Sequence, residues 1–366
     1  MSYGLDNLPY AALVGADGRR FAGVRFEDAV LDLVHVDPAL FSDGTLDAFL
    51  AAGPESWARV RAETAALIDT GALQLIPIEE VTPVLGFTVA DFVDFYASEH
   101  HASNAGRIFR PNADPLPANW KRLPIGYHGR SGSVIASGTP VHRPEGILGP
   151  DRFGPTQRLD FEAELAFVVG HPGRRIPVGD ADRHVFGVCL LNDWSARDIQ
   201  SFETVPLGPF LGKSFATSVS PWITPLSALG PVRRPAAEQR PRPVAHLVDS
   251  DGRHGLDVDL EIRINDEVVS RPRFADTYWT YAQMLAHLTS NGATARTGDV
   301  FASGTVSGPD RERRGCLLEL TWNGTEPLRV GSEERAWLAD GDVVTLSASA
   351  GDVSLGEVSG RILPPG

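Results

Sequence analysis

Short apolar segments near the start of the chain predict a small β module with helices. Residues 10–15 and 20–25 have the composition of strands, and an Asp-Gly pair between them is a turn signal. Apolar residues then recur with helical spacing over residues 46–50 and 57–68. Because a proline-bounded segment follows, we expect residues 1–86 to form a separate domain.

The rest of the chain, residues 87–366, predicts a larger β domain. Gly, Pro and short apolar runs are frequent in it, as they are in β-sandwiches and barrels. Residues 160–167 have the pattern of a strand, and the uninterrupted apolar run 185–191 predicts a buried one. The expected fold class is therefore mainly β.

The composition narrows the class of partner. A net charge of −14 disfavours nucleic acid and anionic membranes, because phosphate is repelled by an acidic surface. Cys189 and Cys316 have neither the spacing of a zinc site nor that of a disulfide framework. No leader pattern and no apolar run of about 18 residues is present. We therefore expect a cytoplasmic protein that acts on a small molecule.

Four acidic residues are candidate metal ligands: Asp94, Glu162, Glu164 and Asp193. Strand alternation puts Glu162 and Glu164 on one face, where their charges repel unless a cation or a partner lies between them. An isolated Glu-x-Glu is more often the exposed edge of a strand, and Asp193 could instead cap a helix. Together the four carboxylates are typical of a Mg²⁺ or Ca²⁺ site. Zinc is disfavoured, because neither His-Glu-x-x-His nor paired Cys is present.

His101 is a candidate general base. Asp94 precedes it by seven residues, so a helix there would place both side chains on one face. A histidine near carboxylates can accept a proton near neutral pH, although a lone histidine is more often structural. Arg197 and Gln200 follow Asp193 by four and seven residues and would share a helical face with it, which could equally be a solvated surface.

Lysine is nearly absent from the chain. Of 33 basic residues only Lys121 and Lys213 are lysine, and the rest are arginine. Compositional bias could explain this. Some sites, however, need a compact ammonium on a flexible stem and not a planar guanidinium, so Lys213 is a candidate catalytic cation. The segment 208–214 is one residue too short for a Walker A loop, and residues 212–216 lack the last glycine of a nucleophile elbow. We therefore expect neither nucleotide binding nor a serine nucleophile.

Longer motifs resemble the fumarylacetoacetate hydrolase family over essentially the whole chain. They lie at residues 94–101, 123–130, 137–140, 159–164, 192–200, 205–215 and 302–305. The run 205–215 and residues 7–10 resemble the fumarylacetoacetase branch, which carries an N-terminal SH3-like module. The resemblance implies an SH3-like domain followed by a large mixed β-sandwich roll, and a homodimer that hydrolyses a carbon–carbon bond of a β-diketone.

The resemblance also assigns roles to individual residues. The metal ligands would be Asp94, Glu162, Glu164 and Asp193, with a second cation near Lys213 and Thr217. His101 would activate water, and Glu319 would orient His101. The oxyanion would be stabilised by Arg197, Gln200 and Lys213, and the substrate would be contacted by Tyr96, Arg110, Tyr127, Gln200 and Thr305. The implied cofactor is Mg²⁺, Ca²⁺ or both. The residue types suit the chemistry, because a preorganised oxyanion donor typically lowers the barrier by ~3–4 kcal/mol and a divalent ion stabilises an enolate leaving group.

The implied reaction converts 4-fumarylacetoacetate into fumarate and acetoacetate, the last step of tyrosine breakdown. Thr204 stands where the family has a substrate-contacting tyrosine, and Ala216 where it has a glycine, so hydrolysis of an acylpyruvate or another diketo acid is the alternative. A decarboxylase or isomerase is disfavoured, because His101 and Glu319 supply a water-activating pair. A non-catalytic binding module is disfavoured, because the base, Lys213 and all four carboxylates are present.

Overall fold

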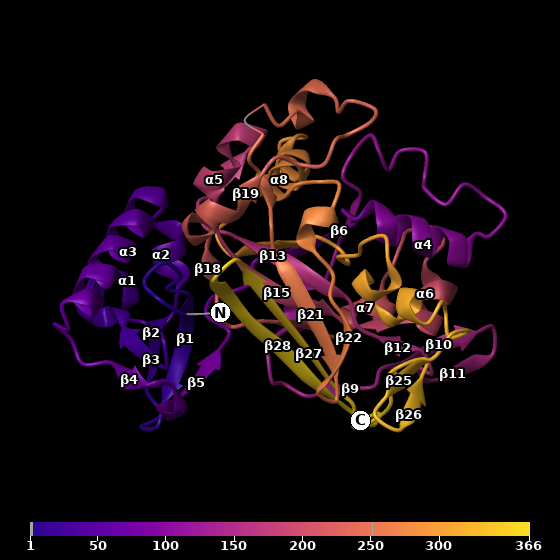
Figure 1. Cartoon of the computed structure of the whole chain (residues 1–366), viewed down its shortest axis with the longest axis horizontal. Helices are drawn as coiled ribbons and strands as arrows, with labels where there is room; N and C mark the ends of the chain where they lie inside the picture. The colour runs from indigo at the N-terminus through magenta and orange to yellow at the C-terminus, as the bar shows by residue number, and fades with distance from the viewer. Residues whose placement is uncertain (1–2, 251) are drawn as a thin grey trace.

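The computed structural model describes residues 3–250 and 252–366 and is mainly β, as the sequence predicts (Figure 1). Its N-terminal part contains a five-stranded antiparallel sheet in the order β4-β3-β2-β1-β5. The strands are β1 (Tyr10–Gly15), β2 (Arg20–Phe26), β3 (Ala29–Asp32), β4 (Ile76–Pro77) and β5 (Val81–Val84), and the helices beside them are α1 (Pro38–Phe41), α2 (Asp47–Ala51) and α3 (Pro54–Asp69). The two predicted strands and both predicted helices of this part are confirmed.

This N-terminal part shares a hydrophobic core with the rest of the chain. The ring of Phe186 packs edge-on against the rings of Tyr10, Phe49 and Trp57, with centroids 5.3 Å apart in each pair. The backbone of Tyr10 also exchanges hydrogen bonds of 2.9 and 2.8 Å with that of Ile223. The module is therefore packed onto the larger sheet and not held by a flexible linker.

Two sheets form the larger part. The eight-stranded sheet runs β7-β6-β24-β13-β15-β17-β8, with β18 paired to β15, and the five-stranded sheet runs β22-β21-β27-β28-β9. Their strands are β6 (Asp91–Phe95), β7 (Gly126–His128), β8 (Val134–Ala136), β9 (Val141–His142), β13 (Ala163–Val169), β15 (Val185–Asp193), β17 (Thr217–Val219), β18 (Thr224–Pro225), β21 (Asp259–Ile264), β22 (Glu267–Ser270), β24 (Asp299–Ala302), β27 (Val343–Ala350) and β28 (Val353–Leu363). Apolar side chains of both sheets and of α8 (Tyr281–Thr289) form one core.

The remaining elements are short. The helices are α4 (Glu99–Phe109), α5 (Ala181–His184), α6 (Arg197–Glu203), α7 (Leu211–Ser214) and α9 (Leu317–Leu320). Two-stranded pairs are made by β10 (Glu145–Gly149) with β11 (Arg152–Pro155), β12 (Leu159–Asp160) with β16 (Ser195–Ala196), β14 (Gly173–Arg174) with β23 (Thr294–Ala295), β19 (Arg233–Arg234) with β20 (Gly255–Leu256), and β25 (Leu328–Val330) with β26 (Glu333–Arg335). Within the described ranges no helix has the length and apolarity that crossing a bilayer requires.

Sheet register brings the functional segments together where neighbouring strands start or end, which is called one edge of the sheet below. β13 and β15 are buried along their whole length, which their long apolar runs explain. Their antiparallel pairing sets Ala163 opposite Asn192, so the start of β13 lies beside the end of β15. β24 continues the sheet, and its Ala302 pairs with Asp94 of β6. Carboxylates far apart in the sequence are thereby brought to a common edge.

Candidate active site

Three of the four predicted carboxylates converge at this edge. One oxygen each of Asp94, Glu162 and Asp193 lies within 4.8 Å of the others, and all three side chains are buried. Asp94 is on β6 and Asp193 ends β15, as the buried run predicts, whereas Glu162 precedes β13 and forms an isolated bridge with Cys316. Because like charges repel in a buried site, the cluster calls for a cation.

Glu164, the fourth predicted ligand, is fully buried on β13 beside this cluster. Its Oε2 accepts a hydrogen bond of 3.1 Å from the backbone N–H of Gly304. Its Oε1 and the Oδ1 of Asp94 are buried without a hydrogen-bond partner among the described residues. Buried carboxylate oxygens without donors are the atoms that a hard divalent cation would coordinate, so the residues present fit Mg²⁺ or Ca²⁺.

The protein itself neutralises only part of this negative charge. Burial raises the pKa of Asp94 to about 8, and the neighbouring Asp193 adds to the shift. Burial also raises the pKa of Glu164, and the charge of Asp94 raises it further. Although burial opposes ionisation of Glu162 as well, the Lys213 ammonium and the Arg197 guanidinium hold its pKa below the ordinary value.

Lys213 supplies one of these cations from α7. Its Nζ pairs with Glu162 and, at 2.9 Å, with Asp193 Oδ2. The Glu203 carboxylate accepts the backbone N–H groups of Phe210 and Gly212 at 3.0 and 2.7 Å, and so caps the turn that carries the lysine. Both negative partners outweigh burial and raise the pKa of Lys213, which keeps the ammonium charged.

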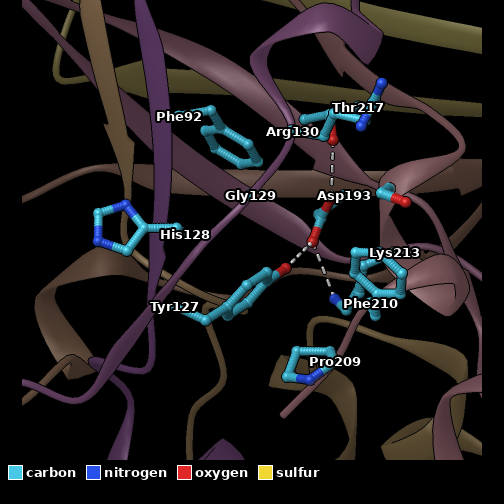
Figure 2. A pocket seen from close by; sticks show the side chains of 11 residues that line it. Phe92, Tyr127, His128, Gly129, Arg130, Asp193, Pro209, Phe210, Lys213 and Thr217 are labelled. Atoms are coloured by element: carbon cyan, nitrogen blue, oxygen red, sulfur yellow. Dashed lines mark hydrogen bonds and ion pairs between the residues drawn. The ribbon is translucent and has the colours of Figure 1, made fainter. Parts of the chain in front are cut away.

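Asp193 is the centre of the pocket drawn in Figure 2. Tyr127 Oη donates to its Oδ2 and Thr217 Oγ1 to its Oδ1, both at 2.9 Å. A cavity of about 130 Å³ opens beside these groups, with Phe210 and Pro209 on its rim. Two residues predicted to bind a second cation, Lys213 and Thr217, therefore contact the same aspartate.

His101 and Glu319 form a buried pair, as predicted from the resemblance. His101 Nδ1 lies 2.6 Å from Glu319 Oε2. Asp94 and His101 do not lie on one helix, so the condition for their sharing a helical face is not met: Asp94 is in β6, and α4 begins at Glu99 after Ser98, whose Oγ accepts the His101 N–H at 3.2 Å. A strand therefore delivers the carboxylate and a separate helix delivers the imidazole.

Three further donors surround Glu319 that the sequence did not reveal. Asn104 Nδ2 donates to Oε1 at 2.9 Å, and Ser307 Oγ and Cys316 Sγ donate to Oε2 at 2.7 and 3.2 Å. Burial alone would raise the pKa of Glu319, but its contacts with His101, Asn104 and Ser307 lower it to about 2. Asn104 follows His101 by one helical turn, a spacing that could have indicated it; Ser307 is distant in sequence and gave no signal.

Arg197 and Gln200 lie on α6, as predicted, but the helix begins at Arg197 and its N-terminus has no side-chain cap. The alternative that Asp193 caps this helix is therefore wrong. Arg197 is buried, and its Nη1 donates to Gln200 Oε1 at 3.1 Å while its Nη2 forms a 2.8 Å ion pair with Glu162. The guanidinium thus links the carboxylate cluster to the glutamine.

The predicted substrate contacts differ in how they are held. The Tyr96 ring stands edge-on to the His101 ring with centroids 5.3 Å apart. Thr305 Oγ1 is buried without a hydrogen-bond partner among the described residues, so it is ready for a ligand. The Arg110 side chain is exposed, and its Nη2 donates to the carbonyl of Pro115 at 3.0 Å. The Thr204 hydroxyl donates to the Gln200 carbonyl at 2.7 Å, so it serves the helix end.

The chain is similar to known proteins along most of its length. Residues 91–362 match the family described as Fumarylacetoacetate (FAA) hydrolase C-terminal. A fumarylacetoacetase from Oryza sativa is 44% identical, covering 88% of this chain and 82% of that protein. The fumarylacetoacetase of Homo sapiens is 40% identical, covering 98% of this chain and 96% of that protein.

Solved structures share the fold at low sequence identity. Fumarylacetoacetate hydrolase from Exiguobacterium antarcticum superposes with a TM-score of 0.65 at 19% identity, over 98% of this chain and 99% of the other. Maleylpyruvate hydrolase from Sphingobium sp. SYK-6, in complex with manganese(II) and pyruvate, gives 0.58 at 17% identity, over 98% and 100%. The fold predicted from the resemblance is thereby confirmed.

Proposed function

Because the chain belongs to the fumarylacetoacetate hydrolase family, we propose that it hydrolyses 4-fumarylacetoacetate to fumarate and acetoacetate. The observation that carries the proposal is the buried pair of His101 and Glu319 close to a carboxylate cluster. A hydrolase of this kind needs both a base for water and a charged site for a β-diketone. One edge of the sheet supplies both.

His101 is the base. The low pKa of Glu319 keeps that carboxylate ionised, so it accepts a hydrogen bond from Nδ1–H and leaves Nε2 free to take a proton from water. The water oxygen bonds to the carbonyl carbon of the fumaryl group, and the oxygen of that carbonyl becomes an oxyanion. Gln200, Arg197 and Lys213 provide the donors and the positive charge near it.

The carbon–carbon bond then breaks, and its electron pair goes to the acetoacetate fragment as an enolate. Protonated His101 returns its proton to this fragment, which balances the reaction. Asp94, Glu162, Glu164 and Asp193 would hold Mg²⁺ or Ca²⁺, with a second cation near Lys213 and Thr217. When bound, a divalent ion supplies Lewis-acid stabilisation of the enolate oxygens. Buried oxygens of Asp94 and Glu164 without donors support this assignment.

Substrate specificity rests on Tyr96, Arg110, Tyr127 and Thr305. Their hydroxyl and guanidinium groups suit a substrate with a carboxylate at each end. Thr204 favours a second candidate, hydrolysis of an acylpyruvate, because its hydroxyl bonds to the backbone and no aromatic ring occupies that position. The two candidates share the same catalytic steps and differ in the acyl group that the pocket accepts and in the enolate that leaves, which is that of pyruvate for an acylpyruvate and that of acetoacetate for fumarylacetoacetate.

Turnover by the purified protein tests the proposal. Fumarylacetoacetate and acetylpyruvate are followed by loss of diketone absorbance, with a chelator and then Mg²⁺ or Ca²⁺ added back, and with His101→Ala as the control. We expect metal-dependent cleavage of fumarylacetoacetate that the substitution abolishes. Cleavage of acetylpyruvate alone would select the second candidate, and no cleavage of either would refute both.

We also propose a cytoplasmic homodimer. Exposed apolar side chains gather in two neighbouring segments, Ile147 and Phe153 on β10 and β11, and Val205, Leu207 and Phe210 between α6 and α7. A second copy would remove them from water. The two cysteines are free and buried, which suits a reducing compartment. Light scattering after size exclusion measures the mass, and a monomer at micromolar concentration would contradict the dimer.

A further inference from the structure

Asp160 is a fully buried carboxylate that the reaction does not use directly. Its Oδ1 accepts the backbone N–H of Leu317 at 2.7 Å and that of Phe161 at 2.8 Å. Its Oδ2 accepts the backbone N–H of Leu318 at 2.9 Å and Arg197 Nε at 2.8 Å. Only an ionised carboxylate offers acceptors to four donors at once, so the side chain is matched to its surroundings by charge.

The contacts of Asp160 with α9 concern the residue that pairs with the general base. α9 is a single turn that carries Glu319. Cys316, the residue immediately before this turn, makes no side-chain cap. The Asp160 carboxylate performs that task from another segment by accepting the N–H groups of Leu317 and Leu318. Glu319 follows by one residue, so its direction toward His101 depends on this anchor.

The other contact of Asp160 leads to the oxyanion side. Arg197 uses Nε for Asp160, Nη2 for Glu162 and Nη1 for Gln200 Oε1. Because the amide oxygen of Gln200 faces the guanidinium, its N–H groups face the other way, which is the orientation that an oxyanion donor needs. Nε and Nη1 thus donate hydrogen bonds to protein groups, whereas Nη2 faces Glu162 as an ion pair without a hydrogen bond, so Arg197 orients Gln200 in addition to placing positive charge beside the oxyanion.

We propose that Asp160 is a positioning residue that couples the two halves of the active site. Through α9 it aims Glu319 at His101, and through Arg197 it turns the Gln200 amide toward the oxyanion. The inference rests on the proposed hydrolysis, but it concerns how this chain holds its own groups. Because Asp160 contacts both segments, it fixes the position of the His101–Glu319 pair relative to the Gln200 amide. A small misplacement of such groups can cost about 100-fold in rate.

Asp160→Asn tests this with a side chain of the same shape. The amide turns one acceptor into a donor that faces Arg197 Nε and the Leu318 N–H, so at least one contact is lost. We expect kcat to fall about 100-fold while KM changes by less than roughly threefold. Asp342→Asn is the matched control: that buried aspartate accepts Arg335 Nε at 3.1 Å and the Ala339 N–H at 2.8 Å, and touches no site residue.

Double-mutant cycles separate positioning from a general loss of stability. In a Gln200→Ala or Glu319→Gln background, Asp160→Asn should lower kcat at least about tenfold less than in the wild type, because one of its two routes is already gone. Losses that simply multiply in both backgrounds, or an equal loss of kcat in Asp342→Asn, would overturn the proposal.

Arg197→Lys provides a second route if Asp160→Asn does not fold. It keeps a positive charge but loses the planar fork, so its kcat loss should shrink in the Gln200→Ala background. An undiminished loss would contradict positioning through Gln200. All values are ratios to the wild type on whichever diketo acid it cleaves. Inactivity of the wild type would refute the proposed function and this inference with it, whereas an active wild type with undiminished losses in these cycles would refute this inference alone.

Discussion

Gly212 lies so close to Gln200 that no side chain fits between them. A Cβ on Gly212 would come 2.7 Å from the backbone nitrogen of Gln200 and 2.8 Å from its Cα and Cβ. This contact sets the distance between α6 and α7, and the two helices carry the proposed oxyanion donor and the catalytic lysine.

Gly212→Ala should therefore push Gln200 and Lys213 apart. We expect a loss of stability of about 1–3 kcal/mol from overpacking and a fall in kcat of about 100-fold. Gly230→Ala is the control, because a Cβ there meets nothing within 4 Å. Urea denaturation and steady-state kinetics of both variants give the answer; equal activities would show that α6 and α7 can shift without consequence.

Lys213→Arg should inactivate the enzyme even though the charge is kept. The ammonium lies buried between Glu162 and Asp193, where the space holds one compact Nζ, and a larger planar guanidinium would place its nitrogens elsewhere. A loss of kcat of about 100- to 1,000-fold is expected, as for other oxyanion donors. Lys121→Arg, at the half-buried pair with Glu99, exchanges the only other lysine and should leave the kinetics unchanged. Wild-type rates in Lys213→Arg would remove the lysine from the proposed chemistry.

Removing divalent ions should lower the melting temperature. Without a cation Asp94, Glu162 and Asp193 face one another in a buried site, and a ligand that binds only the folded state stabilises it by mass action. Adding Mg²⁺ or Ca²⁺ to chelator-treated protein should raise the melting temperature, and Asp94→Asn should abolish that response. Asp91→Asn, exposed on the same strand, should respond as the wild type does. An ion response in Asp94→Asn equal to the wild type's would exclude this site.

Glu319 should make stability depend on pH in the acid range. Its pKa in the folded protein, about 2, lies below the ordinary value of 4.5, so ionised Glu319 stabilises the fold above pH 4.5. That contribution is lost as the pH falls from 4.5 toward 2. Glu319→Gln should therefore cost up to about 3 kcal/mol at pH 7 and progressively less on acidification.

Urea unfolding of both proteins from pH 7 to pH 3 measures the difference. Glu326→Gln, at an exposed position, should show a small gap that does not change with pH. A gap for Glu319→Gln that stays constant over the range would mean that the carboxylate gains nothing from its buried donors.

Local sequence pattern predicted those parts of the site that depend on single elements. The run 185–191 is uninterrupted and apolar, so it predicted both the buried strand β15 and the odd position of Asp193 at its end. The same reasoning left the element that carries Asp94 open, because a segment of five residues that mixes aspartate with apolar side chains can be read with either a helical or a strand period. Ser98 marks the true start of the helix that carries His101.

Contacts between distant segments could not be predicted from spacing. Ser307 and Asp160 are ordinary polar residues of loops and strand ends, and their partners lie 12 and 157 residues away. Sheet pairing alone brings them together, since Glu162 bridges to Cys316 just before α9. The role of Glu319 came from resemblance to a family, and the roles of its neighbours required the structure.

The burial of β13 and β15 also sets the order in which the site comes apart. Their amides should be among the last to exchange with deuterium, and Glu164 and Asp193 belong to these strands. Val205 and Leu207, by contrast, are exposed within a single copy of the chain, on the connection between α6 and α7. On warming, Lys213 should therefore separate from Glu162 and Asp193 before the carboxylates separate from one another. A brief thermal opening would then remove the lysine and leave the cation site folded. Cooling would restore activity without refolding of the cation site.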